Sequence, residues 1–155
     1  MRLTNTYGPG MRVKDARQTF LGIWVRRVIE GKPIQVYGDG RQLRDFNFVT
    51  DVVKALLQAA SDPASEGQLF NLGHWEHISL AELAALLVRL NKRGGYELIP
   101  FPADHKAIDI GDYYGDFSKI QNALGWSPEV VLESGLAMTL EYYRKRHAHY
   151  WNSKT

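Results

Sequence analysis

One stretch of the sequence limits the possible folds more than any other: residues 32–51, which read KPIQVYGDGRQLRDFNFVTD. Residues 34–37 favour a β-strand, and the Gly-Asp-Gly turn at 38–40 contains two residues that can adopt positive φ without steric cost. A second β-favouring run follows, after which Thr50 or Asp51 can cap a helix. The pattern predicts a strand, a glycine turn, a second strand and the start of a helix.

The same stretch combines groups that suit a nucleotide. A strand edge offers backbone N–H and C=O groups to a flat heterocycle, the ring of Tyr37 can pack on it, and the guanidinium of Arg44 can bind a phosphate in bidentate fashion. The plainer alternative is an ordinary hairpin turn in which Arg41 and Arg44 are solvated. Spacing alone favours that plainer alternative.

Apolar residues at helical spacing predict a helix over residues 16–30 that ends at Gly31. Its Trp24 belongs to the apolar stripe and is assigned to the core, whereas Arg26 and Arg27 fall on the opposite side. The helix that follows the central stretch has an apolar stripe made of Val52, Val53, Leu56, Leu57 and Ala60. Each helix is therefore expected to bury one face.

The second half of the chain contains further elements. A capping box over residues 79–82 begins a helix that reaches about Asn91. After a polar loop, Asp116 and Gly125 are expected to cap a short helix. Two more strands are predicted, over residues 67–73 and 96–99. The buried face of the final helix is expected to contain Leu136, Leu140 and Tyr143.

Composition excludes several classes of protein. The 155 residues, 45% of them hydrophobic, suit one globular domain, and a net charge of +2 without a basic block indicates neither a nucleic-acid nor a membrane partner. The absence of cysteine excludes disulfides and thiolate metal sites, and without a signal peptide or an apolar span a cytoplasmic location is the default. No metal site is predicted, because ligand spacing is lacking and we expect solvated side chains for His74, His77, His105, His147 and His149.

Three segments carry a resemblance to a known family. They are Arg-x-x-Asn-x-Tyr-Gly-Pro at residues 2–9, Gly-x-Gln-x-Arg-Asp-Phe-x-x-Val-x-Asp at 40–51, and Asp-x-Ser-Lys-x-x-x-x-Leu-Gly-Trp-x-Pro at 116–128. In order and spacing they resemble the NAD-dependent nucleotide-sugar epimerases and dehydratases of the extended short-chain dehydrogenase/reductase family. The resemblance covers nearly the whole chain, but only the C-terminal, substrate-binding portion of the family's fold.

The resemblance implies a small mixed α/β substrate-binding domain from which most of the Rossmann sheet is missing. Residues 1–155 would form this single domain, with residues 1–12 as a remnant strand and loop of the sheet. The glycine-rich NAD motif of the family is absent from the sequence, and no tyrosine is assigned to the family's catalytic Tyr-x-x-x-Lys pair. No catalytic residue is therefore assigned. NAD would serve the complete enzyme, and the chain alone is expected to bind no cofactor and to be inactive.

The resemblance also assigns ligand roles to residues. The implied contacts to a nucleoside-diphosphate sugar are Asn5, Gln35, Tyr37, Arg44, Asn71 and Lys106. Arg44 would hold the diphosphate, whereas Lys106 lacks the bidentate geometry of the Arg that many members have there. Asn71 could instead cap a turn. Tyr7 and Pro9 would shape the loop near the nicotinamide of the cofactor.

Three functional hypotheses follow. In the first, the chain is the substrate-binding part of a nucleotide-sugar epimerase or dehydratase, whose N-terminal Rossmann half is supplied in cis or in trans. In the second, it is a stand-alone nucleotide-sugar-binding module. In the third, it is an interaction protein whose sheet edge at residues 2–4 docks another chain, possibly that N-terminal half. The sugar and the base stay open at this level.

Overall fold

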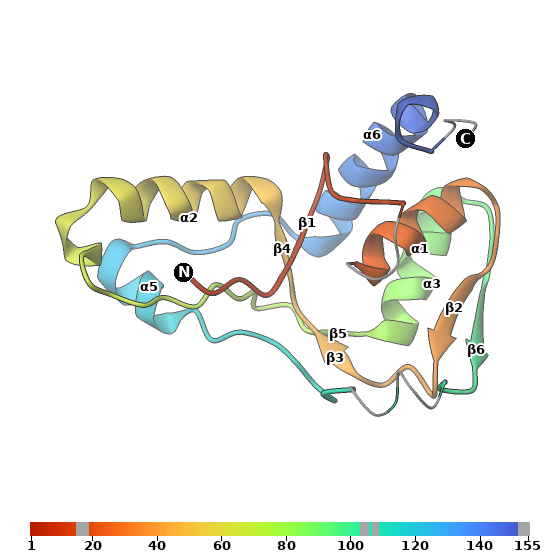
Figure 1. Ribbon diagram of the computed structural model, residues 1–155, viewed down its shortest axis with the longest axis horizontal. Coiled ribbons are helices and arrows are strands. Elements are labelled where there is room, and N and C mark those ends of the chain that lie inside the picture. The colour runs from red at the N-terminus through yellow and green to blue at the C-terminus, as the bar shows by residue number, and fades with distance from the viewer. Residues whose placement is uncertain (15–18, 103–105, 107–108, 152–155) are drawn as a thin grey trace.

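The computed structural model describes residues 1–14, 19–102, 106 and 109–151. They form a small mixed α/β structure with an elongated shape (Figure 1). Helices α2 (Val49–Ser61) and α5 (Ser118–Leu124) lie at one end of it, and α1 (Phe20–Ile29) and α3 (Leu80–Asn91) lie toward the other. The chain also contains a short 3₁₀ helix, Pro63–Ser65, and the long helix α6 (Leu132–Trp151).

The described strands form three two-stranded sheets. They pair β1 (Asn5–Tyr7) with β4 (Phe46–Phe48) in parallel, β2 (Ile34–Tyr37) with β6 (Tyr96–Ile99) in parallel, and β3 (Leu43–Arg44) with β5 (Ile78–Ser79) in antiparallel fashion. The Gly-Asp-Gly turn has the predicted conformation, with φ of 68° at Gly38 and 67° at Gly40. It does not make a hairpin, because it leads the chain from the β2 sheet to the β3 sheet. The expected second strand is divided at Asp45.

Several predicted helix boundaries are confirmed. The backbone N–H of Glu82 donates to Ser79 Oγ at 3.2 Å and the backbone N–H of Ser79 donates to Glu82 Oε2 at 3.0 Å, which completes the capping box of α3. Gly31 and Gly125 follow α1 and α5 with positive φ. The first part of the helix predicted over residues 16–30 lies outside the described residues, and α1 begins after its cap, Thr19.

The apolar side chains form two clusters. In the larger one, α1, α3 and α6 pack on the β1, β2 and β4 strands. Its most buried members include the predicted final-helix residues Leu136, Leu140 and Tyr143. The smaller cluster joins α2 to α5 and consists of Val52, Ala55, Phe70, Leu72, Ile120 and Trp126. These clusters hold the strands that position the site.

Two predictions for α2 are wrong. Asp51 is not its cap: Phe48 precedes the helix without a side-chain cap, and Asp51 is buried in the first turn. Of the predicted apolar stripe only Val52 is buried, whereas exposure reaches 47% at Val53 and 65% at Leu57. The physical reason is that the described chain packs only the face of α2 that carries Asp51 and Val52. Helical periodicity identifies an apolar face but not whether anything covers it.

Three further predictions need correction. The helix capped by Asp116 starts one residue later than expected, after Phe117, although the Asp116 carboxylate still accepts from the Ser118 N–H at 2.8 Å. The strand predicted over residues 67–73 is reduced to a bridge between Asn71 and Arg2. His74 is buried, contrary to the expectation of solvated histidines, while His105 lies outside the described residues. Within the described chain, no helix is long and apolar enough to cross a membrane.

Gly135 gives a direct test of the packing of α6. An alanine Cβ there would overlap the Tyr7 hydroxyl and approach Phe48 Cδ2 to 2.9 Å. Gly135→Ala gains about 1 kcal/mol in helix propensity, but overpacking costs about 1–3 kcal/mol and disturbs a buried tyrosine. We therefore expect a net decrease in the free energy of unfolding, measured by urea denaturation. Gly95→Ala, where a Cβ meets nothing within 4 Å, should change it by less than about 0.5 kcal/mol. A stabilised Gly135→Ala variant would contradict this packing.

Candidate functional site

A cavity of about 340 Å³ lies between α1 and the end of β2. Phe20, Ile23 and Trp24 of α1 form one wall. Gln35 and Tyr37 line the cavity from β2 because alternate residues of a strand point to the same side, while their neighbours Ile34 and Val36 are buried in the core. The alternation along β2 thus separates the core from the cavity.

Flat aromatic surfaces enclose part of this cavity. The ring of Tyr37 lies 5.6 Å from that of Phe101, centroid to centroid, and Phe20 and Trp24 meet edge to face at 5.1 Å. Trp24 is buried in the core, as predicted, and it also lines the cavity. Such surfaces favour a planar ligand group.

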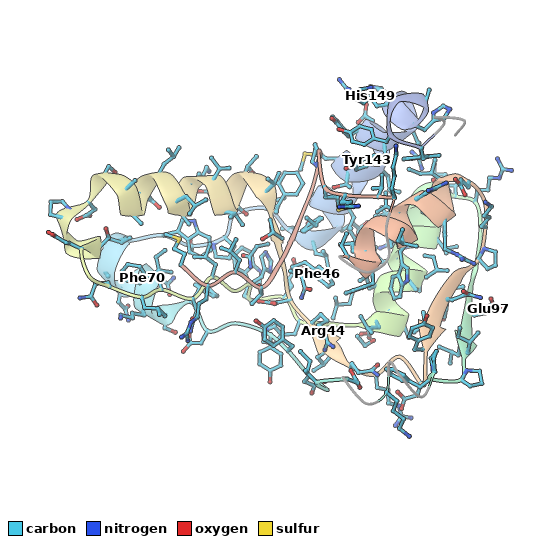
Figure 2. All side chains as sticks on the ribbon, in the orientation of Figure 1. Arg44, Phe46, Phe70, Glu97, Tyr143 and His149 are labelled. Atoms are coloured by element: carbon cyan, nitrogen blue, oxygen red, sulfur yellow. The ribbon has the colours of Figure 1, made fainter. Side chains whose placement is uncertain are left out.

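Arg44 places a positive charge at the cavity. Its guanidinium Nη1 donates to the carbonyl oxygens of Leu43, at 2.8 Å, and of Gly111, and Nη2 lies 3.9 Å from Asp109 Oδ1. Arg44 lies on β3 (Figure 2). Only 11% of its side chain is exposed. These contacts fix the orientation of the guanidinium, which suits it to bind an anion.

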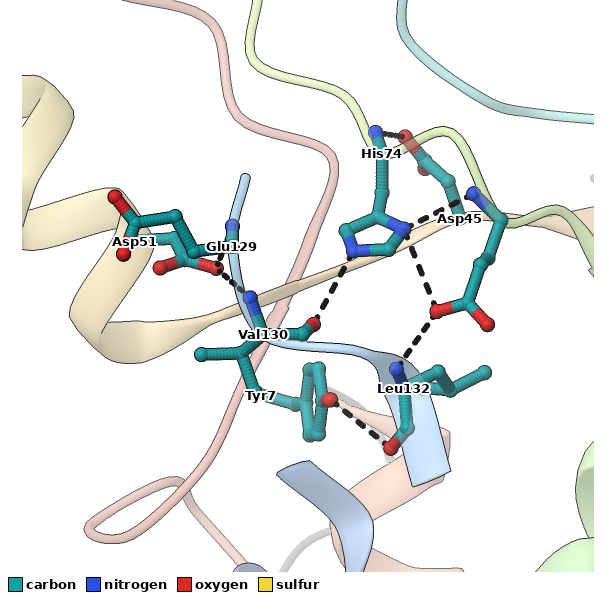
Figure 3. Close-up of polar contacts among 8 residues, drawn as sticks. Tyr7, Asp45, Asp51, His74, Glu129, Val130 and Leu132 are labelled. Carbon is teal, nitrogen blue, oxygen red and sulfur yellow. Dashed lines mark hydrogen bonds and ion pairs between the residues drawn. The ribbon is translucent and has the colours of Figure 1, made fainter. Parts of the chain in front are cut away.

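The residue after Arg44 begins a buried polar network (Figure 3). Asp45 Oδ2 accepts from the backbone N–H groups of His74, at 3.0 Å, and Gly115, at 3.1 Å. His74 Nδ1 accepts from the Glu76 N–H at 3.0 Å, so the ring proton is assigned to Nε2, which contacts the Val130 carbonyl oxygen at 3.2 Å. Asp45 thereby connects the strand that carries Arg44 to two loops, one that contains His74 and one that contains Gly115.

Further bonds in this network hold residues 129–132, the segment that precedes α6. Asp51 Oδ2 accepts from the N–H groups of Glu129 and Val130, both at 3.0 Å. Glu76 Oε2 accepts from the Leu132 N–H at 2.7 Å, and the Tyr7 hydroxyl donates to the Leu132 carbonyl at 3.3 Å. With the bond from His74 to Val130, four side chains from distant parts of the sequence hold this one short segment, and they fix the start of α6.

Burial governs the protonation of two members of the network. It lowers the pKa of His74 below the ordinary value, against the opposing effect of the nearby Glu76 carboxylate. It also raises the pKa of Tyr7 well above the ordinary value, with the charges of Glu76 and Asp51 acting in the same direction. His74 is consequently neutral and Tyr7 protonated near neutral pH. Both act as hydrogen-bond partners in the core.

The structure brings three predicted ligand residues, Gln35, Tyr37 and Arg44, to the same cavity. The Gln35 amide Nε2 also donates to Glu97 Oε1 at 3.2 Å. Asn5 does not line the cavity, but its Nδ2 donates to the Asp45 carbonyl at 3.0 Å, next to Arg44 along the chain. The ligand roles of these residues stay predictions.

The remaining predicted site residues lie elsewhere. Asn71 is exposed at the bridge to Arg2, and Lys106 is exposed and does not line the cavity. Tyr7 is buried among aromatic rings, whereas Pro9 is half-buried in the following loop. The proposed contacts of Tyr7 and Pro9 with a cofactor are not tested by this arrangement.

Sequence reasoning missed other residues of the site. Asp109 and Phe101 come from the polar loop, where no pattern distinguishes them. Arg27 was assigned to the solvent side of its helix, yet it lines the cavity, and its guanidinium is held by the carbonyl of Pro33, which follows the helix. Asp45 belongs to the Arg-Asp-Phe motif, which was a usable signal. His74 had no such signal.

Comparison with known proteins identifies the class. Residues 1–73 match the profile of the NAD dependent epimerase/dehydratase family. UDP-glucuronic acid decarboxylase 1 of Xenopus tropicalis is 33% identical over 153 residues, which cover 99% of this chain and 35% of that protein. A dTDP-glucose 4,6-dehydratase of Neisseria gonorrhoeae is 36% identical over 150 residues, covering 90% of this chain and 42% of the dehydratase. The chain belongs to the extended short-chain dehydrogenase/reductase family.

Solved structures give the same result for the fold. A UDP-glucose 4-epimerase of Thermotoga maritima, determined with UDP-glucose, matches with a TM-score of 0.82 and 30% identity over 94% of this chain and 45% of the epimerase. MoeE5, in complex with UDP-glucuronic acid and NAD, matches with a TM-score of 0.79 and 30% identity over 93% of this chain and 46% of MoeE5. The chain thus spans less than half the length of these relatives.

The depressed pKa of His74 predicts how stability depends on pH. In the unfolded chain His74 titrates near about 6.5, so below that pH the unfolded state binds more protons than the folded state. The stability linked to His74 is complete above about 6.5 and is lost as the pH falls below that value and through the lower pKa of the folded state. Urea denaturation should show a steeper loss for the parent than for His74→Gln. His77→Gln, at an exposed histidine, should keep the parent's slope, and equal slopes in parent and His74→Gln would contradict this assignment.

Proposed function

We propose that this chain is a single C-terminal substrate-binding domain of an NAD-dependent nucleotide-sugar epimerase, dehydratase or decarboxylase. The cavity between α1 and β2 would bind the nucleoside-diphosphate part of the substrate. The observation that carries the proposal is the meeting of Arg44 with the aromatic walls of Tyr37 and Trp24 in one cavity. A cation beside flat apolar surfaces matches the two unlike parts of a nucleotide.

In this proposal Arg44 binds the diphosphate and the base lies along β2 beside Gln35 and Tyr37. Asp109, whose Oδ1 lies 3.9 Å from Arg44 Nη2, would face the ribose hydroxyls rather than the phosphates. A carboxylate accepts hydrogen bonds, and hydroxyls can donate to it whereas ionised phosphate oxygens cannot. The names of the relatives support this substrate class, since they include UDP-sugar and dTDP-sugar enzymes.

NAD, which accompanies MoeE5, fits this chain poorly. No glycine-rich pyrophosphate motif occurs in the sequence, and the hydroxyl of Tyr7 is engaged by the Leu132 carbonyl in the core. We therefore place the cofactor on an N-terminal half, with Pro9 and the loop around it at its border. Without that half this chain would bind no NAD and catalyse no reaction.

Two surfaces support docking of such a half. Helix α2 presents Val53, Leu56 and Leu57, which are 47–65% exposed, and an apolar face of this kind is commonly covered by another part of a protein. The segment at Arg2 is bonded to residues 70 and 72 on one side, and its other side would be available to a strand of that half.

A stand-alone nucleotide-sugar-binding module remains the second candidate. The observation that favours it is that this chain alone brings Gln35, Tyr37 and Arg44 to one cavity. Binding without the N-terminal half is therefore physically reasonable, and binding alone does not separate the two functions. Turnover after addition of an N-terminal half would distinguish the enzyme part from the stand-alone module.

Titration calorimetry with uridine diphosphate tests the nucleotide site. The parent chain should bind, and Arg44→Ala should weaken binding at least about tenfold, because a hydrogen bond to a charged group contributes about 1.5–3 kcal/mol. Arg41→Ala is the matched control: Arg41 lies three residues before Arg44 with 89% of its side chain exposed, and its removal should change affinity by less than about twofold. Absence of binding by a folded parent would refute the proposal for this chain.

A chimaera tests the docking surface. Joining the N-terminal part of the Thermotoga maritima epimerase to this chain should give an enzyme that binds NAD and converts a UDP-sugar. Leu57→Lys should lower its activity at least about tenfold, since a buried unpaired ammonium opposes docking, but should leave the melting temperature of the isolated chain unchanged. Gln58→Lys, which adds the same charge at the neighbouring residue, should lower the activity of the chimaera less. Full activity of the Leu57→Lys chimaera would show that α2 is not covered.

A further inference from the structure

Arg27 is a cation of the cavity that no sequence motif assigns. It lies in the last turn of α1, its Nε donates to the Pro33 carbonyl at 2.6 Å, and its side chain lines the cavity. Among the residues that the structure describes, its Nη groups have no hydrogen-bond partner. The bond to Pro33 fixes the guanidinium and leaves the Nη donors for a ligand.

Both Arg27 and Arg44 line the cavity, and their contacts lie on either side of β2 along the chain. Pro33 immediately precedes β2, so Arg27 is beside the start of that strand. Arg44 lies beyond the Gly-Asp-Gly turn that follows the end of β2, where it contacts Gly111 and Asp109. A four-residue strand is about 10 Å long, which is close to the distance that a ribose and a base span.

The chemistry of a pyrimidine nucleotide then places one atom at Arg27. With the phosphates at Arg44, the ribose follows and the base extends toward the start of β2. The ring is attached to ribose through N1, and C4 is opposite N1, so the substituent on C4 is the part of the base farthest from the phosphates. That substituent is a carbonyl oxygen in uracil and thymine and an amino group in cytosine.

We propose that Arg27 is a specificity-determining residue that selects uracil or thymine over cytosine by donating to the oxygen on C4. The inference rests on the proposed nucleotide function. A guanidinium has five N–H donors and no acceptor, so it satisfies a carbonyl but leaves an amino group facing another donor. The Gln35 amide nitrogen at this end is already bonded to Glu97, so it does not compete for the oxygen.

The test compares uridine and cytidine diphosphates by titration calorimetry on the full chain. The parent should bind uridine diphosphate at least about tenfold more tightly. Arg27→Met, which keeps much of the apolar stem, should bring the two affinities within about threefold of each other. Arg26→Met is the matched control, since Arg26 carries the same charge on the same turn but pairs with Glu30 at 2.9 Å and does not line the cavity. It should keep the parent's preference.

Arg27→Gln provides a second variant, because an amide can donate or accept and should tolerate both bases; circular dichroism confirms that each variant is folded. The inference is overturned if the parent shows no preference, or if the folded Arg27 variants keep it, while uridine diphosphate still binds through Arg44. Failure of the folded parent to bind uridine diphosphate at all would instead overturn the proposed function.

Discussion

The organisation of the site depends on the hydrogen bonds that the buried Asp45 carboxylate accepts. A buried charge is tolerated only where hydrogen bonds replace water, and the N–H groups of His74 and Gly115 provide them. In bonding to both, Asp45 gathers the loop before β5 and the loop before α5 onto the strand that carries Arg44. The guanidinium of Arg44 consequently meets the carbonyl of Gly111 in a fixed position.

The network behind the cavity and the cavity itself have different tasks. Residues 129–132 are hydrogen-bonded to the side chains of Asp51, Glu76, His74 and Tyr7, and these bonds place α6 against the strands (Figure 3). The cavity residues Arg44 and Arg27 instead donate to backbone carbonyls, which hold their guanidinium groups at the cavity. This division suits the substrate-binding role proposed for this chain.

Much of the architecture could be predicted locally. The capping box at Ser79, the positive φ of Gly38 and Gly40, and the strand over residues 34–37 depend on neighbours in the sequence, and all are present. The family motifs also led to Gln35, Tyr37 and Arg44, which share one cavity. Asp51, by contrast, has every local property of a helix cap, yet its partners are the amides of residues 129 and 130, far along the chain.

The sequence alone therefore determined most of the helices, the strands over residues 34–37 and 96–99, the glycine turn and the family, because short-range backbone preferences and motif spacing encode them. Tertiary structure decided which polar groups are buried and which apolar ones are not. His74 is enclosed because Asp45, Glu76 and Val130 converge on it, and Leu57 is exposed because nothing in the described chain packs on its side of α2. Arg27 lines the cavity for a similar reason: the carbonyl that holds its guanidinium belongs to Pro33, outside the helix, and helical periodicity does not contain that information.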